Sequence, residues 1–134
     1  MIIVPWIRKL PQVSLFIIVG GGAAAVHFFS VIFFVELFAV PAMLANIFAF
    51  FIAFCFSFLG QRYLTFSDSN QSFYYSLKRY FFVSACSFMF NEGLFFVSIY
   101  HLHAPYFIAL PIIVLLVAIG TFIVTKRWAF KLSQ

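Results

Sequence analysis

Long apolar runs dominate this chain, and charged residues and prolines separate them. No charged residue interrupts the run from Leu10 to Val35, which is longer than the core of a signal peptide and long enough to cross about 30 Å of hydrocarbon. The breaks predict four membrane spans, at approximately residues 13–35, 42–61, 80–99 and 106–125. Backbone groups in lipid must be hydrogen-bonded within their own segment, so each span should be an α-helix.

The connections between the predicted spans differ in polarity. Glu36 and Pro41 bound a tight connection after the first span, and Pro105 closes another after the third. Between the second and third spans lies a polar loop, residues 67–72. A short interfacial lead-in, containing Pro5 and Trp6, precedes the first span.

The basic residues predict how the chain is oriented in the membrane. They precede the first span, flank the 67–72 loop and follow the fourth span, whereas the other two connections contain none. The eight are Arg8, Lys9, Arg62, Lys78, Arg79, Lys126, Arg127 and Lys131. Because lysine and arginine are retained on the cytoplasmic side, we expect both termini and the loop to be cytoplasmic.

Composition excludes a soluble domain. The chain is 66% hydrophobic and 8% charged, with 23 phenylalanines, whereas a soluble domain carries about 25% charged residues. The net charge of +5 is therefore interpreted as a topology signal and not as a nucleic-acid footprint. Cys55 and Cys86 lie in apolar runs and are expected to behave as small hydrophobic residues. We expect no disulfide framework, no metal site and no cofactor.

The two halves of the chain resemble each other at an offset of 64 residues. Pro41 then falls on Pro105, and the segment SFLGQRYLTF (57–66) falls on TFIVTKRWAF (121–130). Each half holds two predicted spans, so two repeats would share one orientation in the membrane, unlike inverted repeats. The expected fold is an all-α membrane protein whose four helices form two parallel two-helix repeats.

These motifs resemble the GtrA-like family. The resemblance rests on a first span rich in small residues, the segment LANIFAF (44–50), and the pattern SFxxxRxxTF (57–66) with its echo KRWAF (126–130). It covers about residues 14–130 and implies a single domain over residues 1–134. It further implies translocation of polyprenyl-phosphate-linked monosaccharides across the bacterial inner membrane, for glycosylation of envelope polysaccharides. The chain departs from the family pattern at His27 and Gln61, so the sugar stays unidentified.

Basic residues at the ends of the spans are candidates for binding the lipid's phosphate. Arg62 and Lys126 occupy equivalent positions in the two halves, and Arg79 and Arg127 lie at the same level. A guanidinium can hold a phosphate through two parallel hydrogen bonds, whereas an ammonium acts as a compact charge. The alternative is that these residues only set the topology and attract anionic lipid.

Four polar residues within the spans are candidates for the translocation path. Glu92 lies about 20 Å along its helix from Arg79, and His27 is about equally deep in the first span. Asn46 and Asn91 lie in the same outer half. Ionisable groups in hydrocarbon cost about 2.5–3.5 kcal/mol or more, which favours a functional role for Glu92. The alternative is that the four residues hydrogen-bond to one another and hold helices together.

We expect a translocase and not an enzyme, because the sequence shows neither a nucleotide-binding motif nor an acid–base pair. One alternative is a proton-coupled exporter of small cations, although small multidrug resistance transporters carry their carboxylate in the first span and Glu92 lies in the third. Another is a subunit that recruits a membrane glycosyltransferase. Four helices enclose little room, so we also expect a homo-oligomer, most simply a dimer that packs through residues 20–25.

Overall fold

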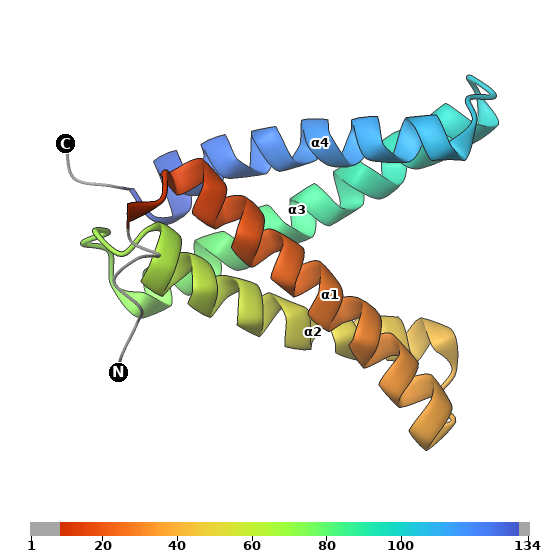
Figure 1. Ribbon diagram of the computed structural model, residues 1–134, viewed down its shortest axis with the longest axis horizontal. Helices are drawn as coiled ribbons and strands as arrows, with labels where there is room; N and C mark the ends of the chain where they lie inside the picture. Colours follow the sequence, from red (N-terminus) through yellow and green to blue (C-terminus); the bar gives the residue numbers. More distant parts are fainter. Residues whose placement is uncertain (1–8, 132–134) are drawn as a thin grey trace. The chain divides into compact units, whose positions relative to one another are not determined.

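The computed structural model describes residues 9–131, and every regular element in this range is a helix (Figure 1). The four long helices are α1 (Gln12–Phe38), α2 (Ala42–Gly60), α3 (Phe73–Tyr100) and α4 (Tyr106–Val124). Two short π-helical segments, η2 (Gln61–Thr65) and η3 (Thr125–Ala129), continue α2 and α4. The lead-in with Pro5, Trp6 and Arg8 lies outside the described residues.

All four predicted membrane spans are present as helices. Gln12–Phe38, Ala42–Thr65, Phe73–Tyr100 and Pro111–Ala129 are each long and apolar enough to cross a membrane. The prediction of an all-α multi-pass membrane protein is therefore confirmed. The cytoplasmic placement of the termini stays a prediction.

The chain forms two compact units. Unit 1 comprises the residues up to Ser69 and pairs α1 with α2, whereas unit 2 begins at Asn70 and pairs α3 with α4. Within each unit the paired helices lie along each other (Figure 1). That the whole chain is one domain stays a prediction.

Small residues allow the helices of unit 1 to approach closely. Three alanines of α2, at positions 45, 49 and 53, are buried at a spacing of four residues and therefore share one helix face. Gly60 also lies on this helix, and a Cβ built there would be only 2.6 Å from Cγ1 of Val19. The contact between α1 and α2 thus depends on glycine at this position.

The third helix begins earlier than the sequence predicts. The predicted span starts at residue 80, whereas α3 starts at Phe73. The cause is a helix cap, since the Ser72 hydroxyl accepts a hydrogen bond from the Tyr75 amide at 3.3 Å. Lys78 and Arg79 therefore lie within the first turns of α3 and not in the loop before it.

A residue with positive φ follows both the first and the third helix: Ala39 is the C-cap of α1, and His103 lies three residues after the end of α3 at Tyr100. Ala39 and His103 have φ values of 50° and 51°, in the left-handed region. In each case the following amide bonds back to the helix, from Val40 to the Phe34 carbonyl at 3.1 Å and from Ala104 to the Ser98 carbonyl at 2.9 Å. Such a left-handed residue is a common helix terminator.

The offset of 64 residues recurs in the bounds of the elements. It relates Ala39 to His103, α2 to α4, and η2 to η3. The two units thus share a sequence of structural features as well as their sequence motifs. The origin of both units from one repeat stays a prediction.

Candidate functional site

Each unit has one π-helical segment, η2 in unit 1 and η3 in unit 2, and in each a wider turn carries basic residues. The Phe66 amide bonds to the Gln61 carbonyl at 2.8 Å, and the Phe130 amide bonds to the Thr125 carbonyl at 3.0 Å. Both phenylalanines are buried. One extra residue in a turn shifts the side chains that follow by about 100°. The π turns therefore bring these rings into the protein, and such turns are frequent at functional sites.

Both π turns also contain buried polar side chains, which were not predicted from the sequence. Gln61 is 1% exposed, and its Nε2 donates a hydrogen bond to the Phe16 carbonyl at 3.3 Å. Gln61 Oε1, Thr65 Oγ1 and Thr125 Oγ1 are buried without a hydrogen-bond partner among the described residues. Leaving such an atom unpaired costs about 1–3 kcal/mol. Gln61 and Thr125 are equivalent by the offset of 64, which is the sequence signal that could have identified them.

Arg79 is held in place by two aromatic rings and one hydrogen bond. Its Cζ lies 4.0 Å from the centre of the Tyr75 ring and 4.6 Å from that of Trp128. Its Nη1 donates a hydrogen bond to the Trp128 carbonyl at 2.9 Å. Cation–π contacts of this kind contribute about 0.5–1 kcal/mol each at exposed sites. Because this hydrogen bond uses one of the five N–H donors of the guanidinium, four other N–H groups can bind an anion.

The other predicted phosphate ligands lie on the two π turns. Lys126 is half-buried on η3, with its Nζ 5.8 Å from the centre of the Phe122 ring, and Arg127 beside it is exposed. The structure therefore places Arg79, Lys126 and Arg127 where α3 meets η3. Arg62 is half-buried at the equivalent position of η2 in unit 1. That Arg62 joins the others in one phosphate site stays a prediction.

The four residues of the predicted translocation path are divided between the units. His27 is half-buried on α1 and Asn46 is exposed on α2, whereas Asn91 is half-buried and Glu92 exposed on α3. Within each unit, no hydrogen bond joins the two members over residues 9–131. Their assembly into one polar layer stays a prediction.

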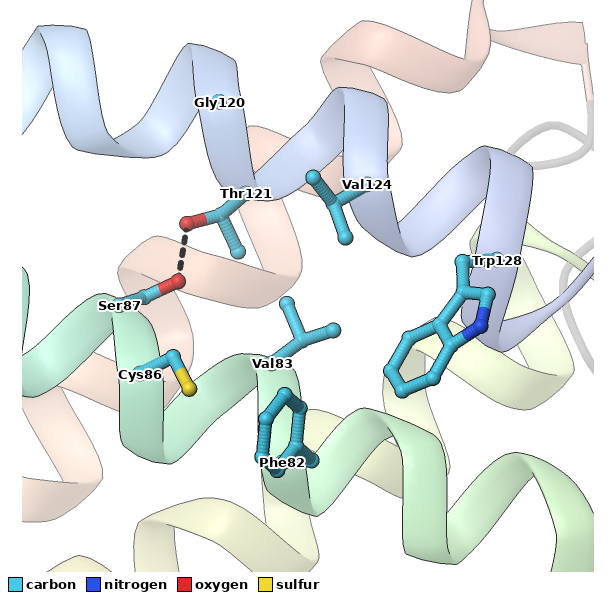
Figure 2. A pocket seen from close by; sticks show the side chains of 8 residues that line it. All are labelled: Phe82, Val83, Cys86, Ser87, Gly120, Thr121, Val124 and Trp128. Atoms are coloured by element: carbon cyan, nitrogen blue, oxygen red, sulfur yellow. Dashed lines mark hydrogen bonds between the residues drawn. The ribbon is translucent and has the colours of Figure 1, made fainter.

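A groove lies between α3 and α4. It has a volume of about 350 Å³, and Figure 2 shows the eight residues that line it. Phe82 and Trp128 lie at one end, with ring centres 5.9 Å apart. The Ser87 and Thr121 hydroxyls lie 2.7 Å apart across the helix pair. Thr121 donates to the Val117 carbonyl at 2.7 Å, so Ser87 is the donor in the bond between the hydroxyls.

Comparison with known proteins gave one match to a family. The model of the family described as GtrA/DPMS, transmembrane domain, matches residues 15–130, which are nearly the whole chain. The comparison with curated proteins found no match. The matched range includes both π turns, Arg79 and the groove.

Proposed function

The chain belongs to the GtrA/DPMS transmembrane-domain family, and from this premise we propose that it translocates a polyprenyl-phosphate-linked monosaccharide. Proteins of this family are generally translocases or membrane subunits that handle sugars on a lipid carrier. The proposed location is the bacterial inner membrane, and the proposed purpose is glycosylation of a cell-envelope polysaccharide.

The main support for this proposal is that the Arg79 guanidinium is held by the rings of Tyr75 and Trp128 and by the Trp128 carbonyl. It is fixed at the start of one membrane-spanning helix, against the end of another. A cation at this level meets the phosphate of a membrane lipid, and an oriented guanidinium loses less conformational entropy when it binds. Lys126 and Arg127 on η3 add positive charge beside it.

The proposed mechanism moves the head group while the polyprenyl chain stays in hydrocarbon. The phosphate binds first at Arg62, Lys126, Arg79 and Arg127, and the sugar then passes His27, Asn46, Asn91 and Glu92. Hydrogen bonds from these polar side chains replace water around the sugar hydroxyls. Each hydroxyl left unpaired in hydrocarbon would cost several kcal/mol. No covalent bond is formed or broken, so the proposed activity is transport and not an enzymatic reaction.

A paired assay tests this assignment of roles. Binding of polyprenyl phosphate is measured on purified protein in detergent, and arrival of the lipid-linked sugar at the opposite leaflet is measured in vesicles. We expect Arg62→Ala and Lys126→Ala each to weaken binding about tenfold, since hydrogen bonds to charged groups contribute about 1.5–3 kcal/mol. Glu92→Gln should bind normally and translocate slowly.

The matched control is Lys131→Ala, because Lys131 is exposed beyond η3 and should affect neither measurement. If Arg62→Ala and Lys126→Ala both bind and translocate like the wild type, the basic residues only set the topology. Transport of small cations in place of the lipid-linked sugar would support an exporter. Normal lipid binding without translocation, together with co-purification of a glycosyltransferase, would support a recruiting subunit.

We also propose that the protein acts as a dimer. In the predicted packing surface, residues 20–25, a Cβ built at Gly20 or Gly21 meets no atom within 4 Å. Gly22, by contrast, packs against Phe56 within unit 1. Gly20 and Gly21 therefore leave room for a neighbouring helix. Gly21→Leu should reduce cross-linked dimer in native membranes, and an unchanged dimer yield would exclude this surface.

A further inference from the structure

Equivalent positions in the two units pack differently. In unit 1 a Cβ built at Gly22 would lie 3.0 Å from Cε1 of Phe56, so the ring covers this glycine. The residues 64 positions later are Cys86 and Gly120. Unit 1 thus has a glycine on α1 facing a phenylalanine on α2. At the equivalent positions unit 2 has a cysteine on α3 and a glycine on α4.

The missing side chain at Gly120 leaves the helix pair of unit 2 open. A Cβ built at Gly120 meets no heavy atom within 4 Å. Gly120 lines the groove of about 350 Å³ (Figure 2), which adjoins a second space of about 260 Å³ that Phe90 and Leu116 also line. Leu116 on α4 and Trp128 on η3 mark the two ends, which are about 18 Å apart along the continuous helix at 1.5 Å per residue.

The chemistry of the groove suits a hydrocarbon chain. Its polar lining groups are the Ser87 and Thr121 hydroxyls, the thiol of Cys86 and the indole N–H of Trp128, and the two hydroxyls are already hydrogen-bonded to each other. The rest of its lining is aromatic or aliphatic. Such a mostly apolar surface gains free energy chiefly by burying apolar area.

Positive charge lies at one end of the groove. Trp128 lines this end, and the Arg79 guanidinium is stacked on its ring. Lys126 and Arg127 precede Trp128 on η3. A cation at one end and an apolar channel leading away from it complement an anionic head group that carries a long apolar tail.

We propose that this groove binds the isoprenoid chain of the carrier lipid, with the phosphate at Arg79 and the chain running past Gly120 toward Leu116. The inference rests on the proposed function and extends its phosphate site into the hydrocarbon. In unit 1, Phe56 occupies the place that corresponds to the middle of the groove. The carrier lipid is therefore held by unit 2.

Trp128 provides a direct reporter of the occupant. The chain has two tryptophans, so Trp6→Phe leaves Trp128 as the single tryptophan, which is excited selectively over the tyrosines. The protein is placed in nanodiscs of phosphatidylglycerol with brominated acyl chains, which quench tryptophan on contact. We expect unbrominated polyprenyl phosphate to restore Trp128 fluorescence at a concentration at least tenfold below that required for unbrominated phosphatidylglycerol.

Gly120→Phe fills the groove as Phe56 fills the equivalent place. We expect it to weaken the effect of polyprenyl phosphate at least tenfold. Gly93→Phe is the matched control, because Gly93 also has open space around it and lies outside the groove, and it should behave like the parent protein. If Gly120→Phe fails to fold, Gly120→Leu is used in its place. The comparison of the two lipids on the Trp6→Phe protein tests the proposal without any substitution at Gly120.

Three results would overturn the proposal. Equal potency of phosphatidylglycerol would mean that ordinary acyl chains fill the groove. Equal response of Gly120→Phe and Gly93→Phe would mean that the chain binds elsewhere, and normal translocation in Gly120→Phe would then leave the proposed function standing. If Gly120→Phe gave less cross-linked dimer than the parent protein, the groove would be occupied by a second copy of the chain and not by lipid. Failure of the proposed function is recognised separately, by a wild-type protein that does not translocate the lipid-linked sugar.

Discussion

Arg79 donates a hydrogen bond from Nη1 to the main-chain carbonyl of Trp128 at 2.9 Å and stacks on the ring of the same residue. One side chain of α3 thereby binds the backbone and the side chain of η3. A lysine could supply the charge at this position, but it has no planar group to stack and cannot hold the same geometry.

Replacement of Arg79 should therefore separate charge from geometry. We expect Arg79→Lys to weaken polyprenyl phosphate binding several-fold and Arg79→Ala to weaken it about tenfold or more, because a charged hydrogen bond contributes about 1.5–3 kcal/mol. Titration of the lipid in detergent measures both. Lys78→Ala is the control, since Lys78 is exposed one residue earlier. Equal affinities for Arg79→Lys and the wild type would show that charge alone matters.

Gly60→Ala should destabilise unit 1. Its Cβ would lie 2.6 Å from Val19 Cγ1, and overpacking of this kind costs about 1–3 kcal/mol. Thermal denaturation in detergent micelles should show a lower midpoint. Gly93→Ala adds the same methyl group in open space and should not lower it. A midpoint for Gly60→Ala as high as that for Gly93→Ala would show that α1 and α2 can move apart at no cost.

Replacing Ala39 or His103, whose φ angles lie in the left-handed region, with glycine should stabilise the protein. A side chain in this backbone region costs about 1–2 kcal/mol, so Ala39→Gly and His103→Gly should raise the denaturation midpoint. Ala39→Val should lower it, because a β-branched side chain is more strongly strained at φ near 50°. A stabilising effect of valine would contradict the left-handed conformation of Ala39 at the end of α1.

The predicted orientation can be tested by cysteine labelling of intact cells. In a background with Cys55 and Cys86 replaced, a membrane-impermeant thiol reagent should label His103→Cys and leave Asn70→Cys unlabelled. Ser133→Cys, which lies outside the described residues, should also be protected. Permeabilised cells provide the control, because all three positions should then react. Labelling of position 70 in intact cells would show that the predicted orientation is wrong.

Hydropathy predicted the four spans well, because a helix that crosses lipid must be apolar along its whole length. The third span was predicted to start at residue 80 because the charged residues Lys78 and Arg79 were interpreted as its boundary. The helix starts at Phe73 because the Ser72 side chain caps it there. Helix caps depend on single side chains, to which an average over many residues is insensitive.

The candidate site was predicted only in part. The positions of the basic residues were evident from the sequence, but the cage around Arg79 joins Tyr75 to Trp128, which are distant in the chain and meet only through the packing of α3 on η3. The π turns carry no compositional signal of their own. The offset of 64 aligns Phe56 of unit 1 with Gly120 of unit 2, which can be seen in the sequence. That this difference opens a groove in unit 2 could not be predicted, because it depends on the packing of the Phe56 ring over Gly22.

The shared backbone turns at Ala39 and His103 have an experimental consequence. Ala39 carries a methyl group and His103 an imidazole at nearly the same φ and at equivalent places of the repeat, so the effects of different side chains at this backbone angle can be compared within one molecule. Temperature, lipid and expression level are identical for both places, since they belong to one polypeptide. Exchanging the two residues would leave composition and charge unchanged. The chain therefore provides an internal reference against which the cost of each substitution can be measured.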